Sequence, residues 1–401
     1  MKIASVETYL MQAGSPAETA WAAESGGGMS IGGTRQWLFV RIIAEDGTYG
    51  VGEGSGWPIA VEVAVRDLAP LLVGQEVFNI DRLWSRLHLA QMGHGLTGTV
   101  GGGALSALDM ALWDLNGKLL GVPVWRLLGG KFRDVVPAYA HTSSVETTKR
   151  LIDLGYRAFK TGGVSTALDK AVALRATFDN KIDLMVDLHG PPWLTPADAR
   201  RMSREFEPLN LLFLEEPVAP EHPSELLRLR DACHVPVAAG ERTAKIWGLA
   251  PLITSGSIDV AQPDTGRFGG ISQMKKLAAI AEAFGVTIAP HAGTLGPVAE
   301  FAAIHLMAAI PNALILERFG SDWPGRERVI SAPPVFRDGG LEVPDAPGLG
   351  VDLMLDEIAK YPAQRNTGIP NDAHYAPGTT NEHLYIQPRF NATGLRARTA
   401  E

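Results

Sequence analysis

Charged residues and one histidine recur at the ends of short apolar runs along this 401-residue chain. From Lys160 onward these run ends are 23 to 28 residues apart, and they are, in order, Lys160, Asp187, Glu215, Glu241, Asp264, His291 and Glu317. One strand, one helix and two short loops need roughly 25 residues. If the runs are parallel strands of one barrel, all these side chains lie on the same rim, where barrel enzymes keep their active sites.

Three of these residues are consecutive carboxylates, Asp187, Glu215 and Glu241. On neighbouring strands they would face one point, where three ionised groups repel one another by several kcal/mol in a poorly solvated site. A hard divalent cation with oxygen ligands relieves that repulsion, and Mg²⁺ is the usual choice. The alternative is that each carboxylate pairs with a surface Lys or Arg, or caps the helix that follows it.

His291 and Asp264 fall on adjacent predicted strands. An aspartate beside an imidazole fixes its tautomer and raises its basicity, which suits His291 for the role of general base. The alternative is a histidine that only satisfies a backbone group at a strand end.

Three further residues belong to the same rim. His189 lies two residues after Asp187, and alternation along an extended chain would turn both side chains into the mouth. Because Mg²⁺ prefers oxygen ligands, we favour His189 as a general acid rather than as a ligand, with an ordinary loop histidine as the alternative. Lys160 could hold a substrate carboxylate or deliver a proton, or it could simply reach solvent. Glu317 could accept a hydrogen bond from substrate or, if protonated, donate one, or it could form a salt bridge to Arg318 or a neighbour.

The elements that must position these residues begin after Gly130. Eight apolar runs rich in Val, Ile, Leu and Ala alternate there with longer amphipathic stretches, and the first of them is VVPAYA, ending at Ala140. Continuous apolar runs separated by helices are typical of parallel strands buried on both faces. Eight such units predict a β/α barrel over residues 131–330.

The first 130 residues predict a smaller α+β domain. Met1–Leu10 and Trp37–Ile43 have the pattern of strands, and residues 104–121 have the apolar spacing of a helix that stops at Gly121. Residues 13–33 are rich in Gly, Ser and Ala, which predicts either a mobile lid over the mouth or a surface insert. We expect residues 331–401 to pack back on the small domain or the barrel.

Net charge and cysteine content limit the partners. A formal charge of −8 argues against nucleic acid or an anionic membrane as the main partner. The single cysteine, Cys233, allows no intramolecular disulfide, and the N-terminus lacks the pattern of a signal peptide, so we expect a cytoplasmic protein. We further expect a homo-oligomer that acts on a small molecule.

The ordered motifs VDLHG, FLEEP, AAGER, AQPD, GGI, APH and LE, together with ALWDLNGKLLGVPVWRLLGG, resemble one family. The chain is similar to the mandelate racemase branch of the enolase superfamily, and especially to its galactonate dehydratase-like members, over about residues 1–350. The resemblance implies a modified TIM barrel, (β/α)₇β, with an α+β capping domain. It also implies that Asp187, Glu215 and Glu241 bind Mg²⁺, and this superfamily stabilises an ene-diolate with Mg²⁺ beside a Lys or His base.

The remaining roles follow from the same resemblance. Asp264 and His291 would form the general-base dyad, Glu317 would contact substrate, and His189 would be the general acid. Many relatives carry two lysines separated by one residue where this chain has Lys160-Thr161-Gly162. Because a racemase needs a base on each face of the α-carbon, the missing second lysine favours a sugar acid dehydratase. A cycloisomerase or epimerase on the same metal site, or a non-catalytic scaffold, remains as an alternative, and the particular sugar acid is left open.

Overall fold

Eight parallel strands form the barrel of the computed structural model, which describes all residues except 14–34, 191–192, 294, 319–322 and 364–401. The strands are β4 (Val135–His141), β5 (Ala158–Gly162), β6 (Asp183–Asp187), β7 (Phe213–Glu215), β8 (Val237–Ala239), β9 (Val260–Ala261), β10 (Thr287–Ile288) and β11 (Leu316–Arg318). Neighbours pair in parallel from β4 to β10. The ring closes where Ile288 bridges Ala313 and where β11 pairs with β4.

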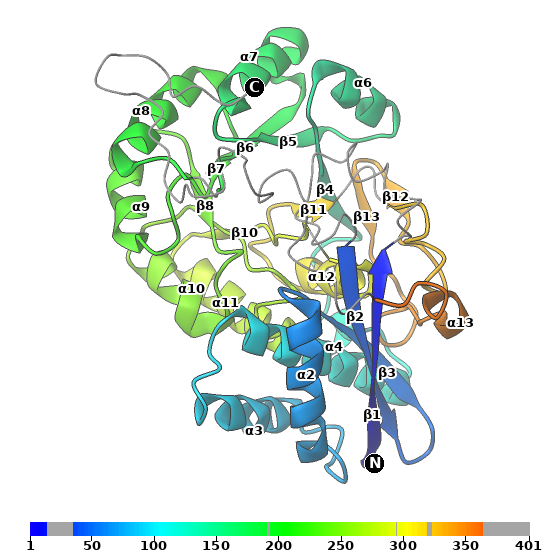
Figure 1. Ribbon diagram of the computed structural model, residues 1–401. Helices are drawn as coiled ribbons and strands as arrows, with labels where there is room; N and C mark the ends of the chain where they lie inside the picture. The colour runs from blue at the N-terminus through cyan, green and yellow to red at the C-terminus, as the bar shows by residue number, and fades with distance from the viewer. Residues whose placement is uncertain (14–34, 191–192, 294, 319–322, 364–401) are drawn as a thin grey trace.

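A helix follows each of the first seven strands, so the predicted (β/α)₇β barrel is confirmed. These helices are α6 (Val145–Asp153), α7 (Ala167–Phe178), α8 (Pro196–Phe206), α9 (Pro223–Arg230), α10 (Lys245–Thr254), α11 (Ile271–Ala283) and α12 (Pro297–Ala309). Short 3₁₀ turns, η4 (Asp179–Lys181) and η5 (Glu207–Leu209), extend two of them. Figure 1 shows α6 to α11 arranged as an arc outside the strands. Hydroxyl caps from Ser144 and Thr195 satisfy free N–H groups at the starts of α6 and α8.

Apolar side chains fill the inside of the barrel below its mouth. Each strand, or the residue next to it, contributes one side chain to this layer: Tyr139, Ala158, Met185, Phe213, Ala238, Val260, Ala289 and Ile315. Because side chains alternate along a strand, the residue two positions further on points to the same side. For seven of the eight strands that next inward position carries a polar side chain, and these residues are His141, Lys160, Asp187, Glu215, Gln262, His291 and Glu317. The packed layer is therefore the floor of the mouth.

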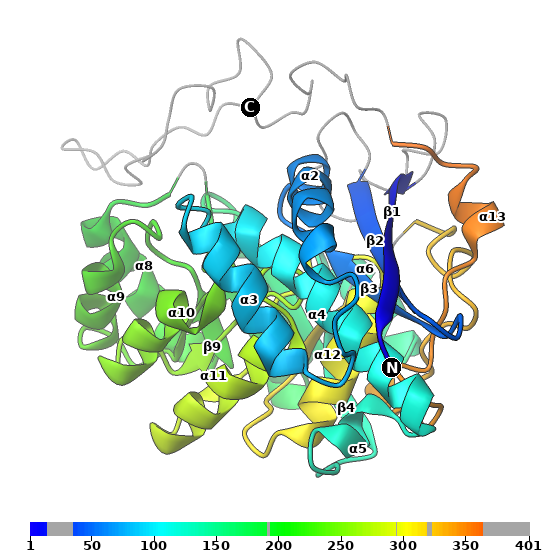
Figure 2. The same cartoon turned by 90° about the horizontal axis from the view of Figure 1, so that it is seen from below.

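The capping domain combines an antiparallel sheet with helices. Strands β1 (Ile3–Ala13), β2 (Arg35–Ala44) and β3 (Tyr49–Gly54) pair in that order. The helices are α2 (Pro58–Leu68), α3 (Ile80–Met92), α4 (Thr99–Leu120) and α5 (Val124–Leu127), with a 3₁₀ turn η3 (Ala69–Leu71). A Cβ at Gly50 or Gly52 would lie about 2 Å from a carbonyl oxygen of α4, so only glycine lets β3 pack this closely on that helix. Figure 2 shows this domain in front of the barrel.

The segment after the barrel contacts both parts of the chain. Strand β13 (Gly340–Glu342) pairs with β12 (Phe336–Arg337) and, antiparallel, with the start of β4, while α13 (Leu355–Ile358) follows later. Pro362 bridges Met11 of the capping sheet. Residues 364–401, and all but the first residue of the predicted 13–33 loop, lie outside the described residues. Among the helices described, none has the length and apolar character needed to cross a bilayer.

Candidate active site

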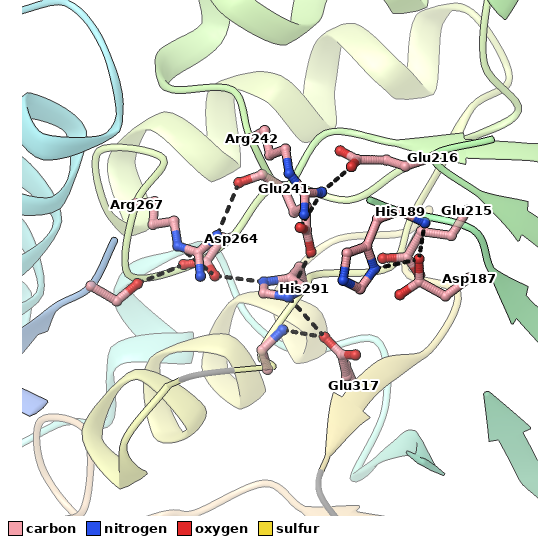
Figure 3. A network of polar contacts seen from close by, with 12 residues as sticks. Asp187, His189, Glu215, Glu216, Glu241, Arg242, Asp264, Arg267, His291 and Glu317 are labelled. Atoms are coloured by element: carbon pink, nitrogen blue, oxygen red, sulfur yellow. Dashed lines mark hydrogen bonds and ion pairs between the residues drawn. The ribbon is translucent and has the colours of Figure 1, made fainter. Parts of the chain in front are cut away.

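All seven predicted strand-end residues, together with His189, lie around one mouth of the barrel. Figure 3 shows most of them pointing toward one another. Asp187 and Glu215 are the last residues of β6 and β7 and are register partners. Glu241, Asp264 and His291 instead lie two or three residues past the short strands β8, β9 and β10. The strands are thus shorter than the apolar runs suggested, but the residues still converge.

Lys160 is the cationic centre of one side of the mouth. Its Nζ lies 2.7 Å from Glu215 Oε2, 2.7 Å from Glu317 Oε1 and 3.3 Å from Asp187 Oδ2. Only 2% of the residue is exposed, so the alternative of a solvent-reaching lysine is wrong. Burial disfavours the ammonium, but Glu215 and Glu317 outweigh it and hold the pKa of Lys160 well above its usual value. The lysine is therefore a permanent positive charge.

His189 faces Asp187, as alternation along the chain predicts. Its Nδ1 lies 2.7 Å from Asp187 Oδ1, and its backbone N–H donates to the same oxygen at 3.0 Å. The charge of Asp187 raises the pKa of His189 to about 9, so this imidazole is protonated at neutral pH. A protonated imidazole at the mouth is able to donate a proton.

Glu215 has an unsatisfied oxygen at the centre of the mouth. The residue is fully buried, and its Oε1 has no hydrogen-bond partner among the described residues. Burial, and then the charge of Asp187, raise the pKa of Glu215 to about 8. Because a buried acceptor without a partner is costly, the geometry points to a missing positive group at this oxygen.

Glu241 is held by two cationic neighbours. Its carboxylate forms an ion pair with the Arg242 guanidinium, and its Oε2 lies 2.7 Å from His291 Nε2. Arg242 also pairs with Glu216, the residue that follows Glu215. Neither Arg242 nor Glu216 was predicted as a site residue. Glu216 has a φ of 39°, in the left-handed region, which breaks the alternation that would otherwise turn it away.

The predicted dyad is present. Asp264 and His291 form a parallel bridge, and His291 Nδ1 lies 2.7 Å from Asp264 Oδ2. The other carboxylate oxygen, Oδ1, accepts hydrogen bonds from Gly266 N at 2.9 Å and from the hydroxyl of Ser55 at 3.2 Å. Ser55 belongs to the capping domain, so both parts of the chain fix this carboxylate. Nε2 is consequently the nitrogen of His291 that can accept a proton from a ligand.

Glu317 contacts a histidine that sequence reasoning missed. His141 Nε2 lies 2.6 Å from Glu317 Oε1, while Ala292 N donates to Oε2 at 2.5 Å. Of the predicted salt bridges, the one to Arg318 is absent because Arg318 binds Glu300, whereas Glu317 pairs with its neighbour on the rim, Lys160. Strand β4 continues to His141, one residue past the predicted end of its apolar run at Ala140. Its signal was available, because His141 stands two residues after the buried Tyr139.

The donor set fits a hard divalent cation in its chemistry. Three buried carboxylates at adjacent strand ends, one of them with an unsatisfied oxygen, are the oxygen ligands that Mg²⁺ prefers. Across the described residues, however, no group of three or more His, Cys, Asp or Glu side chains encloses a ready-made metal position. Lys160, His189 and Arg242 take up the carboxylate charges instead. The chemistry of the ligands thus fits, while their side chains are paired with neighbouring cations.

Comparison with known proteins gives matches along most of the chain. Residues 143–358 match the model of the enolase C-terminal domain-like family, and residues 21–129 match that of the mandelate racemase / muconate lactonizing enzyme N-terminal domain. A D-galactonate dehydratase from Verminephrobacter eiseniae is 36% identical over 82% of this chain and 93% of its own length. One from Pectobacterium atrosepticum is 33% identical over the same shares.

Two solved structures are similar in fold. The 3,6-anhydro-D-galactonate cycloisomerase from Zobellia galactanivorans has a TM-score of 0.80 and 30% identity, covering 91% of this chain and all of its own. An enolase from Pantoea ananatis with bound D-gluconate and Mg has a TM-score of 0.80 and 27% identity, covering 92% and 97%.

Proposed function

Since this chain belongs to the mandelate racemase / muconate lactonizing enzyme family of the enolase superfamily, and is an acid sugar dehydratase like its relatives, we propose that His291 starts the reaction by removing the proton α to the carboxylate of an aldonate. Loss of the 3-hydroxyl then gives a 2-keto-3-deoxy acid. The observation that carries this proposal is the His291–Asp264 pair at 2.7 Å on the same rim as three buried carboxylates. D-Galactonate is the first substrate to test, because two relatives of this chain are named D-galactonate dehydratase.

Asp187, Glu215 and Glu241 would hold the metal, which we propose is Mg²⁺. A bound divalent cation would supply Lewis-acid stabilisation of the charge that develops on the substrate carboxylate. The unsatisfied Glu215 Oε1 supports this assignment, as does the Pantoea ananatis structure with Mg bound.

The proton leaves the substrate through His291 Nε2. Asp264 holds the proton on Nδ1 and thus keeps Nε2 as the basic nitrogen. The structure has Nε2 beside Glu241, so this carboxylate must move away from the ring before a substrate can approach. Ser55 and Gly266 hold Asp264 still while the imidazole acquires its charge.

Lys160 and His189 would complete the elimination. The fixed ammonium of Lys160 stabilises negative charge on the ene-diolate, a charge that is absent from the ground state. His189, whose Nδ1 lies 2.7 Å from Asp187 Oδ1, gives its proton to the departing hydroxyl. A second base at position 162 has no room, since a Cβ there would lie 2.8 Å from Asp187 O. The chain therefore supports elimination better than racemisation.

A screen of acid sugars tests this function. Wild-type protein with Mg²⁺ should convert at least one aldonate to a keto acid that reacts with semicarbazide. The rival function is a cycloisomerase, which the similarity to the Zobellia galactanivorans enzyme favours. That activity would change the substrate without releasing water, so the mass of the product separates the two. A scaffold without activity would give neither a product nor exchange of the α-proton with solvent deuterium.

A further inference from the structure

Lys245 is a buried lysine away from the proposed reaction. It is the first residue of α10, only 2% of it is exposed, and its φ is +62°, in the region that lysine rarely adopts. Its Nζ is covered and has no hydrogen-bond partner within the described residues. Lysine is almost never fully buried unless it is paired, because an unpaired buried charge costs several kcal/mol.

A second unsatisfied group lies nearby in the capping domain. His88 of α3 is 7% exposed, and its Nδ1 is also buried without a partner among the residues described. Burial and then the positive charge of Lys245 lower the pKa of His88, which favours the neutral ring, and a neutral imidazole carries one N–H donor. His88 of α3 also contacts Trp247 of α10, so two buried polar groups without partners lie on the elements that meet there.

Aromatic rings cover this place. The ring of His88 stacks on Trp84 at 4.9 Å and on Trp247 at 4.8 Å between centroids. Trp84 donates its indole N–H to Gly269 O, so that ring is fixed, whereas 60% of Trp247 is exposed. A small molecule could therefore enter if the exposed ring of Trp247 moved aside.

The start of α10 adds a further positive element. The helix has ten residues, and its N-cap residue, Ala244, has no side chain that could cap it. Lys245 N donates to Phe268 O at 3.0 Å and Ile246 N to Gln273 Oε1 at 3.3 Å. Helix N-termini favour negative charge, and this one carries an unpaired ammonium on its first residue. Among the described residues, no acidic side chain forms an ion pair with Lys245. By contrast, Lys276 of the next helix, α11, is paired with Asp81 of α3.

From these observations we propose that Lys245, with His88, anchors a binding site for a small anion of one negative charge at the contact between the capping domain and the barrel. A halide or a small carboxylate has this chemistry. The site rests on Lys245, His88 and the start of α10, and on none of the groups that take part in the proposed dehydration.

The test measures thermal unfolding of the full-length protein in sulfate buffer with added chloride or formate at constant ionic strength. A ligand that binds only the native state raises the Tm in a saturable way. We expect such a rise for the wild type and for Lys276→Met, and its loss in Lys245→Met. The chloride and formate arms show which anion binds. A rise that persists in Lys245→Met, or the same non-saturable response in all three proteins, would overturn the site.

A second measurement needs no variant. Burial lowers the pKa of Lys245 to about 8, so an amine-reactive reagent at pH 8 should label this lysine once Trp247 moves aside. Peptide mapping by mass spectrometry would follow the label at Lys245 and at the ion-paired Lys276. The anion that raises the Tm should slow labelling of Lys245 at least several-fold and leave Lys276 unchanged. Equal labelling of Lys245 with and without the anion would contradict the proposal.

Discussion

The imidazole of His291 and the carboxylate of Asp264 stand on adjacent barrel strand ends and meet at 2.7 Å, Nδ1 to Oδ2. Because this contact occupies Nδ1, Nε2 is the nitrogen that can act as the base once the carboxylate of Glu241, 2.7 Å away, moves aside. The aspartate thus controls which nitrogen of the ring is basic. Replacing Asp264 with Asn would leave an uncharged neighbour that can also hydrogen-bond in the opposite sense. We expect kcat to fall roughly 10²–10⁴-fold, with a much smaller change in KM. Steady-state kinetics on the substrate found in the screen would measure this, and an unchanged kcat would remove Asp264 from the mechanism.

The two histidines should be separable by experiment. His189→Asn removes the proposed acid but leaves His291 and Asp264 in place. Proton abstraction should then continue without elimination, so the substrate would exchange its α-proton with solvent deuterium while keto acid formation falls sharply. NMR of the recovered substrate measures the exchange. Loss of both exchange and product in His189→Asn would show instead that this residue is needed before or during proton abstraction.

Metal binding can be followed without turnover. If Asp187, Glu215 and Glu241 hold Mg²⁺, the cation binds only the folded protein and should raise the Tm. Glu215→Gln should lose most of that rise because the variant lacks one of three charges. Glu282→Gln, an exposed carboxylate on α11, is the matched control and should respond as the wild type does. A Tm that Mg²⁺ does not change in the wild type would contradict the metal site.

Stability at acid pH should depend on His305. This buried residue of α12 accepts a hydrogen bond from Trp125 N on Nδ1, and its Nε2 lies 3.0 Å from Leu349 O. Burial lowers its pKa to about 4, below the ordinary value near 6.5. The unfolded chain therefore binds this proton first, so the contribution of His305 is complete above pH 6.5 and is lost as the pH falls toward 4.

The free energy of unfolding that His305 contributes, and that is lost at acid pH, is about 3 kcal/mol for a pKa shift of this size. Urea unfolding of the wild type and of His305→Gln between pH 4 and 8 measures it. The advantage of the wild type over the variant should shrink as the pH falls. Glu53, Asp109 and Asp114 have raised pKa values and act in the opposite sense, so only the difference between the two proteins isolates His305. A constant difference across this range would contradict the assignment.

Regular spacing made much of the barrel predictable. Four of the site residues stand two positions after an inward-facing apolar residue, as the alternation of side chains along a strand requires. They are Lys160, Asp187, Glu215 and Glu317, and this spacing can be read directly from the sequence. His141 has the same spacing, but it was not predicted because β4 extends one residue past the apolar run in the sequence. The ends of β8, β9 and β10 were not predictable, because the chain stays beside the neighbouring strand for a residue beyond each of β9 and β10, as in the hydrogen bonds Gln262 N to Ala239 O and Ala289 N to Ala261 O.

Contacts between distant segments could not be predicted. Glu216 reaches Arg242 only because its backbone adopts a positive φ, which no periodic pattern encodes for a non-glycine residue. Ser55 reaches Asp264 from the capping domain, 209 residues away along the chain. Such pairs depend on how segments far apart in the sequence pack together, which local spacing does not encode.

Replacing His291 with Asn tests the central claim most directly, because this side chain is the proposed base and Asn retains hydrogen bonding without basicity. The measurement is deuterium incorporation at the α-carbon together with keto acid formation, for the wild type and the variant, with Mg²⁺ present. We predict that both rates fall about 10²–10⁴-fold in His291→Asn. If the variant exchanges the α-proton and forms keto acid as fast as the wild type, His291 is not the base and the proposed mechanism is wrong.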